Sequence, residues 1–220
     1  MMRNLFCLFN LLIFNLVFCQ INIDEIKKNV SENPQKYYYD NLEIYKTTPE
    51  KLTQEQLNYI YYGNNYVDYG YKRIEFNNQL NKVTNFCSKK LSKKLANKVL
   101  EDALSLYQQN PINKELIYDL INIYKTLGDN TKSDFHALQY KLLRETIQKS
   151  GTGKLEEFPI VVTNFSDERI ALEDFSTVFK YGTDFKSKVL PDGSWLNIFR
   201  NGLDLFFVKT VHHKDRFKND

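Results

Sequence analysis

The chain has 220 residues, of which 42% are hydrophobic and 26% charged, so a globular protein is expected and an intrinsically disordered one is excluded. The formal charge of +3 is too small to indicate a nucleic-acid partner. Aromatic residues make up 15%, whereas only 8 Gly and 5 Pro occur, which excludes collagen-like repeats and long flexible linkers.

The N-terminal segment predicts export. Arg3 precedes an apolar stretch of 15 residues from Leu5 to Cys19, which is shorter than the roughly 20 residues that a spanning helix needs. Residues 1–19 are therefore predicted to be a signal peptide, and no permanent membrane span is expected. Cleavage near Cys19 would leave a secreted or periplasmic protein. Lipid anchoring at Cys19 stays open as the less favoured alternative, because the preceding Phe18 is large.

Residues 20–150 are predicted to be a helical region. Thr53 and Gln56 have the spacing of a capped helix start. From Lys89 onward, apolar residues recur every three to four positions, which indicates three amphipathic helices. The first of these is expected to end before Pro111 and the second at Gly128, because Pro disfavours helical geometry in the preceding residue and Gly accepts the left-handed cap.

The spacing of these helices resembles the junction between two tetratricopeptide repeats. Pro111 precedes Tyr124 by 13 residues, and Leu127-Gly128-Asp129 follows at once. The match covers about one and a half units, whereas at least three repeats are normally needed for a free-standing solenoid. This tetratricopeptide-like layer is therefore expected to pack on another element.

Residues 151–220 change to the alternation typical of strands. The turn signals are Pro191-Asp192-Gly193 and Asn201-Gly202. The predicted fold class is α+β, in which the helical layer packs as one unit on a small C-terminal antiparallel sheet. The expected strands lie at 158–162, 185–189, 195–199 and 203–211.

Several motifs together resemble a family of exported proteins with a domain of unknown function, common in Bacteroidetes. They are the Tyr-Tyr-Gly element within Leu57–Gly63, then Leu127-Gly128-Asp129, Ser150–Gly153, Ser166-Asp167-Glu168 and Leu205–Val208. The order of these motifs carries the resemblance. It implies export and a layout of helices followed by a sheet, and it implies no activity.

The sequence offers no catalytic constellation, no metal site and no cofactor motif. Once residues 1–19 are removed, Cys87 is the only cysteine, and it is interpreted as a small buried hydrophobic residue. His136 is expected at the surface or edge of a helix. A structural metal site needs about four ligands with paired spacing, and that pattern is absent from the sequence.

Two sets of residues are the candidate binding sites. Tyr61, Tyr62 and Tyr66 lie in a tyrosine-rich segment and could offer an aromatic face for a peptide, a protein or a glycan, although core positions between helices and sheet are the favoured interpretation. Asp167 and Glu168 are either the first acidic residues of a helix capped by Ser166 or a carboxylate pair for hydrolysis.

The sequence therefore favours a non-catalytic binding or scaffold protein. An exported hydrolase that uses the two acidic residues is the alternative. The sequence leaves the ligand and the oligomeric state open.

Overall fold

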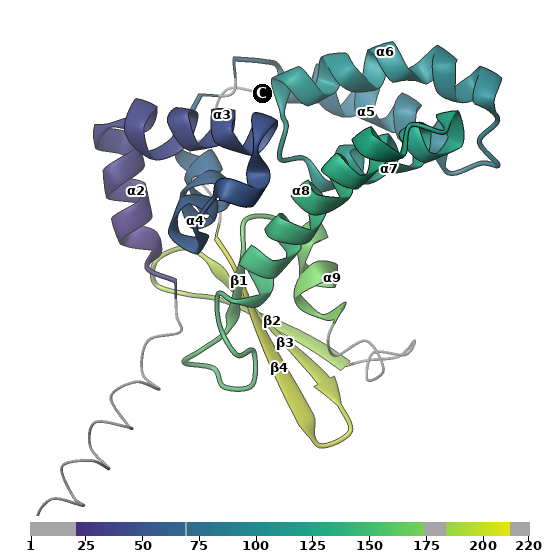
Figure 1. Ribbon diagram of the computed structural model, residues 1–220. Coiled ribbons are helices and arrows are strands. Elements are labelled where there is room, and N and C mark those ends of the chain that lie inside the picture. The colour runs from purple at the N-terminus through teal and green to yellow at the C-terminus, as the bar shows by residue number, and fades with distance from the viewer. Residues whose placement is uncertain (1–20, 69, 174–183, 212–220) are drawn as a thin grey trace, which may run out of the picture. The chain divides into compact units, whose positions relative to one another are not determined.

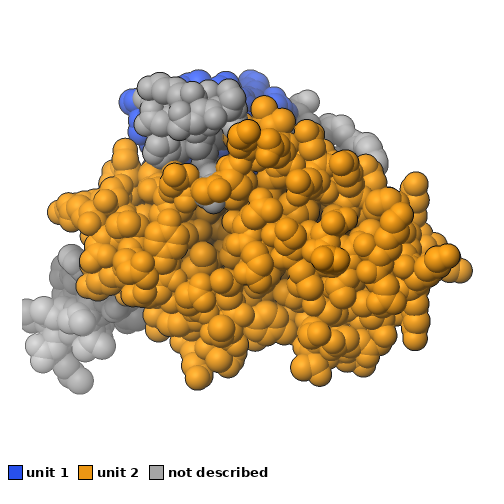
Figure 2. Space-filling view, turned by 90° about the horizontal axis from the view of Figure 1, so that it is seen from above, with its two compact units in different colours: residues 1–22, 147–211 blue, residues 23–146, 212–220 orange. Residues whose placement is uncertain are grey.

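The computed structural model describes residues 21–68, 70–173 and 184–211 (Figure 1). Contacts divide this part of the chain into two compact units, which Figure 2 colours separately. The helical unit comprises residues 23–146, and the sheet unit comprises residues 21–22 and 147–211. The predicted signal peptide, 1–19, lies outside the described residues, so cleavage near Cys19 stays a prediction.

The helical unit contains two groups of helices, and the members of each group pack against one another (Figure 1). In the first group, α4 contacts α2 and α3, and all three helices contact a π-helical turn, η1. In the second group, α5, α6 and α7 contact one another. The bounds are Ile23–Glu32 for α2, Gln35–Tyr39 for η1, Asp40–Thr47 for α3, Gln54–Gly63 for α4, Arg73–Cys87 for α5, Lys93–Gln109 for α6, Lys114–Leu127 for α7 and Asn130–Gln148 for α8.

Local signals define the ends of two of these helices as predicted. The Thr53 hydroxyl accepts a hydrogen bond from the backbone N–H of Gln56 at 3.2 Å, and the Gln56 side chain accepts one from the Thr53 N–H at 2.9 Å, so α4 begins with a capping box. Helix α7 ends at Gly128, whose φ of 87° is left-handed. The tetratricopeptide-like register of α6 to α8 stays a prediction.

The sheet unit contains four strands in the order β1-β4-β3-β2 (Figure 1). The last three strands form the predicted antiparallel meander, and Gly202 turns the β3–β4 hairpin with a φ of 59°. The bounds are Ile160–Val162 for β1, Asp184–Val189 for β2, Trp195–Asn201 for β3 and Asp204–Thr210 for β4, with the short helix α9 at Glu168–Ala171.

The sheet is mixed, which differs from the purely antiparallel sheet expected. Strand β1 pairs in parallel with β4, with Val161 beside Lys209. The chain leaves β1 through α9, which packs on β1 and β4, and returns to the sheet at its far edge, β2. The parallel partners β1 and β4 are separated in the chain by α9, β2 and β3, as expected, since a hairpin can join only antiparallel strands. The α+β class itself is confirmed.

Candidate functional site

The predicted tyrosine site does not form an open aromatic face. Tyr61 and Tyr62 are only 1% and 0% exposed, and their ring centroids lie 4.7 Å apart in an edge-to-face arrangement. Tyr66 is half-buried, with the Lys27 ammonium 6.0 Å from its ring centroid. The structure thus brings Tyr61 and Tyr62 together in the core, where a glycan or peptide does not reach the rings.

The two predicted carboxylates, Asp167 and Glu168, are hydrogen-bonded to other side chains of the sheet unit. Asp167 is buried, and its carboxylate accepts a hydrogen bond from the Asn164 amide at 2.9 Å. Asn164 caps this turn, in place of the expected Ser166, because its side-chain oxygen accepts the Asp167 N–H at 3.1 Å. The hydrogen bonds therefore give Asp167 a structural role.

Glu168, the first residue of α9, is half-buried and contacts the two central strands of the sheet. Its Oε1 accepts hydrogen bonds from the Asn197 amide and, at 2.8 Å, from the Thr210 hydroxyl. Burial raises the pKa of Glu168, while these two donors oppose the rise. Asn197 also accepts a hydrogen bond from Ser187 on β2, so polar contacts cross from α9 to the edge strand. Glu168 thereby fixes α9 on the sheet.

A second polar cluster joins α5 and α7. The buried carboxylate of Asp119 accepts a hydrogen bond from the Thr84 hydroxyl at 2.7 Å and is hydrogen-bonded to the Cys87 thiol. Burial, followed by the charge of Asp119, raises the pKa of Cys87 to about 12. A thiol is nucleophilic as the thiolate, so Cys87 is protonated and unreactive at neutral pH.

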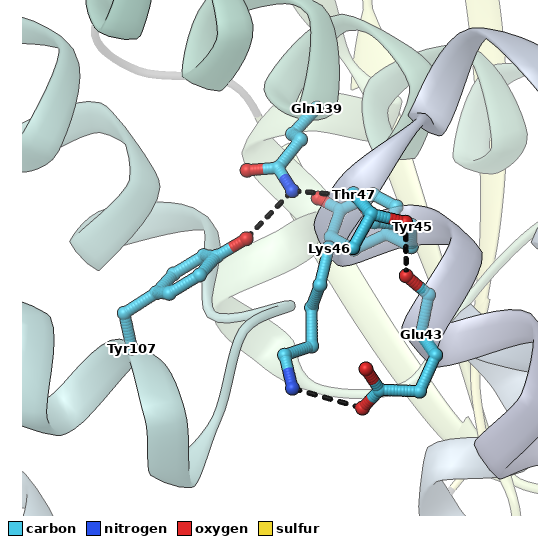
Figure 3. Close-up of polar contacts among 6 residues, drawn as sticks. All are labelled: Glu43, Tyr45, Lys46, Thr47, Tyr107 and Gln139. Atoms are coloured by element: carbon cyan, nitrogen blue, oxygen red, sulfur yellow. Dashed lines mark hydrogen bonds and ion pairs between the residues drawn. The ribbon is translucent and has the colours of Figure 1, made fainter.

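A buried polar cluster of the helical unit centres on Gln139 of α8 (Figure 3). The Gln139 amide donates hydrogen bonds to the Tyr107 hydroxyl at 2.6 Å and to the Tyr45 backbone carbonyl at 2.8 Å. Its oxygen lies 2.9 Å from Nδ1 of His136. The Tyr45 carbonyl lies in the last turn of α3, where it would accept the N–H of the residue four positions later. That residue is Pro49, which has no N–H, so the Gln139 amide donates the hydrogen bond instead.

His136 lies in the core, so its predicted place at the surface is wrong. The imidazole is 5% exposed and stacks on the Tyr124 ring, with centroids 5.6 Å apart and planes 10° apart. Burial lowers the pKa of His136, although its contact with Gln139 opposes this. The imidazole is accordingly neutral at pH 7 and serves packing.

Among the described residues, no three His, Cys, Asp or Glu side chains gather as a metal ion would require. Of the helices that the structure describes, none has both the length and the apolar composition of a membrane span.

One side of the sheet carries exposed apolar side chains, and we call it the apolar face. The register places Phe185 opposite Phe199 and Val189 opposite Trp195, so these four project to the same side. Phe185 is 57% exposed, Val189 60% and Trp195 38%. A further strand beside β2 would cover the side chains of Phe185 and Val189.

Strand β2 also has an open backbone edge. The N–H of Leu190 donates to the Ser194 carbonyl, which directs the even-numbered residues of β2 towards β3. Phe185, Ser187 and Val189 therefore direct their N–H and C=O groups away from β3, and β2 ends the sheet order. Within the described chain, no strand pairs with these groups.

The opposite edge of the sheet is less open. Strand β1 covers β4 from Val208 onward, and the Phe207 N–H donates to the Gly153 carbonyl at 2.8 Å. A shallow groove of about 700 Å³ lies beside the remaining part of β4, between Lys154–Glu156 and Leu203–Phe207. Because Phe207 is already paired there, β2 offers the longer run of outward backbone groups.

The sequence predicted the strand β2 but not its position at the edge of the sheet. The alternation of Phe185, Ser187 and Val189 with two lysines was visible, and lysine on a strand is a common feature of exposed edges. The position of β2 at the edge follows from the strand order, which the alternation alone does not specify.

Residues 24–189 match a family described as "Domain of unknown function (DUF4919)". The matched segment ends at the last residue of β2. No significant match to a curated protein or to a solved structure was found. The expected resemblance to a family with a domain of unknown function is confirmed, whereas its link to Bacteroidetes and the Tyr-Tyr-Gly element stay predictions.

Proposed function

The chain belongs to the family of the domain of unknown function DUF4919, and we propose that it is an exported, non-catalytic protein that binds an extended peptide along the edge of β2. The observation that carries this proposal is the outward backbone of Phe185, Ser187 and Val189 next to exposed apolar side chains. An added strand forms main-chain hydrogen bonds, while side-chain contacts on alternate residues give selectivity.

The geometry supports a peptide better than a glycan. Each outward residue of β2 offers one N–H donor and one C=O acceptor. A second strand offers the complementary groups at the same spacing. The side chains of Phe185 and Val189 lie two strand positions on either side of Ser187 and project to one face. They accept alternate side chains of an added strand, whose other side chains project to the opposite face.

Export of the protein rests on the sequence of its first residues. The charge of Arg3 and the apolar stretch that ends at Cys19 favour a signal peptide. A protonated Cys87 exchanges slowly with disulfides, which suits an oxidising compartment. N-terminal sequencing of the secreted protein tests export directly, with Gln20 as the expected first residue.

The test of peptide binding compares two substitutions at one position. Ser187→Ala and Ser187→Pro both remove the hydroxyl that contacts Asn197, but only proline also removes the outward N–H. The ladder to β3 keeps its bonds in both variants, because that N–H does not take part in it. Circular dichroism would verify that both variants are folded.

Binding to a panel of ten-residue peptides is read from the fluorescence of Trp195, the single tryptophan of the chain. We expect Ser187→Pro to bind at least tenfold more weakly than Ser187→Ala. Equal binding by the two variants would show that the β2 edge is not used. A panel in which no peptide binds the unmodified protein would refute the proposed function.

A further inference from the structure

The side of the sheet opposite the apolar face carries positive charge along β2, and we call it the basic face. Lys186 and Lys188 project to this side, since they alternate with Phe185 and Ser187 along the strand. The register places Lys186 opposite Ile198 of β3, and Arg200 follows two residues later on the same side. All three cationic side chains are exposed.

An acidic side chain already occupies part of this face. Glu156, from the loop before β1, forms an ion pair with Lys188. Among the side chains that the structure describes, none forms an ion pair with Lys186 or Arg200. The basic face therefore already pairs Lys188 with a carboxylate and offers Lys186 beside it, whereas the register sets Asp184 opposite Arg200.

We propose that the peptide bound at the β2 edge alternates apolar and acidic residues, with its acidic side chains on the basic face. This inference rests on the proposed function and specifies its ligand. Residues of an added strand that project to the apolar face lie beside Phe185 and Val189, whereas those between them lie beside Lys186 and Lys188. Opposite charges directly across a strand pair stabilise it, and like charges destabilise it.

A second copy of the chain is a poorer occupant of the same edge. An antiparallel pairing that joins Phe185 of one copy to Val189 of the other continues the apolar face. The same pairing sets Lys186 opposite Lys188 of the second copy, and by symmetry it does so twice. Edge lysines are a common means of preventing such association.

Three peptides of ten residues, with Val at alternate positions and Glu, Thr or Lys between, distinguish the possibilities. We expect the Glu peptide to bind most tightly and the Lys peptide most weakly, with about a tenfold range between them at low salt. The difference between the Glu and Thr peptides should shrink as salt rises, because screening shortens electrostatic interactions to about 10 Å at 0.1 M.

Charge substitutions assign the preference to β2. Lys186→Gln is expected to weaken binding of the Glu peptide by about two- to fivefold, the range of an exposed ion pair. Binding of the Thr peptide should be unaffected. Lys186→Glu should reduce or reverse the order of the Glu and Lys peptides. Lys141→Gln changes the net charge equally on an exposed position of α8 and serves as the matched control.

Each outcome has a separate meaning. Equal affinity for all three peptides would overturn the acidic preference and leave peptide binding standing. If no peptide binds and sedimentation shows a dimer that Ser187→Pro dissociates, a second copy occupies the edge and both proposals fail. If no peptide binds and the amides of Phe185, Ser187 and Val189 are protected from exchange in the monomer, the chain covers its own edge and both proposals fail too.

Discussion

Replacement of Gln139 by methionine should remove more stability than any other single hydrogen-bonding substitution in the helical unit. The side chain is 0% exposed and serves three partners: the Tyr45 carbonyl, the Tyr107 hydroxyl and His136 Nδ1. Methionine preserves the length and the helix propensity of the side chain but offers neither a strong donor nor a strong acceptor. All three partners lose this bond in a site that water does not reach.

The expected loss follows from these partners. A buried polar group left without a hydrogen bond costs about 1–3 kcal/mol. Since the Tyr107 hydroxyl can rotate and helix ends relax, we expect a total of about 3–5 kcal/mol for Gln139→Met, below the simple sum. Tyr107→Phe removes a single hydroxyl and should cost about 1 kcal/mol. The cost of Tyr107→Phe should shrink when Gln139 is already methionine, because the bond between the two is then absent.

Urea denaturation, followed by circular dichroism at 222 nm, measures these free energies of unfolding. Lys141→Met introduces the same residue at an exposed position of the same helix and should change stability by no more than about 0.5 kcal/mol. A loss of less than about 1 kcal/mol for Gln139→Met, with the control unchanged, would show that the cluster around Gln139 does not contribute as described.

Four further changes test other parts of the structure by the same unfolding measurement. Tyr45→Phe should keep or raise stability, because its buried hydroxyl has no hydrogen-bond partner among the described residues. Burial lowers the pKa of His136 in the folded state, so the unfolded state binds more protons and stability should fall as pH drops from 7 to 5, less so in His136→Phe. Gly151→Ala should cost more than about 3 kcal/mol, since its Cβ would lie 2.0 Å from the Pro159 carbonyl oxygen. Burial raises the pKa of Glu168, so its contribution to stability falls as pH rises above about 4.3, and Glu168→Gln should reduce this fall.

Features decided by neighbouring residues could be predicted from the sequence. The capping box at Thr53 and Gln56, the stop at Gly128 and the hairpin at Asn201-Gly202 each depend on the backbone preferences of a few consecutive residues. These preferences act locally, so the correct helix and strand boundaries followed within a few residues.

Features decided by distant residues could not be predicted in the same way. His136 stands between Phe135 and Ala137 in the sequence, which does not specify its burial, whereas the rings of Tyr107 and Tyr124 from other helices pack against the imidazole. The parallel pairing of β1 depends on the contact of Val161 with Lys209, which no local pattern encodes.

The candidate site shows the same division. The alternation in Phe185–Val189 was sufficient to predict a strand, because period two is a property of the segment itself. Whether such a strand is central or at an edge depends on which strands pair, and this is decided by the whole sheet. Tyr61 and Tyr62 illustrate the converse, since an aromatic-rich segment has the same composition in a core and on a surface.

Amide hydrogen exchange of β2, measured by NMR with and without the alternating Val–Glu peptide, tests the central claim most directly. In the free protein, the N–H groups of Lys186 and Lys188 face β3 and should be protected, whereas those of Phe185, Ser187 and Val189 should exchange quickly. We expect the peptide to slow exchange at these three outward amides alone within β2. Binding that leaves all three unprotected would contradict it, because the peptide would then lie elsewhere.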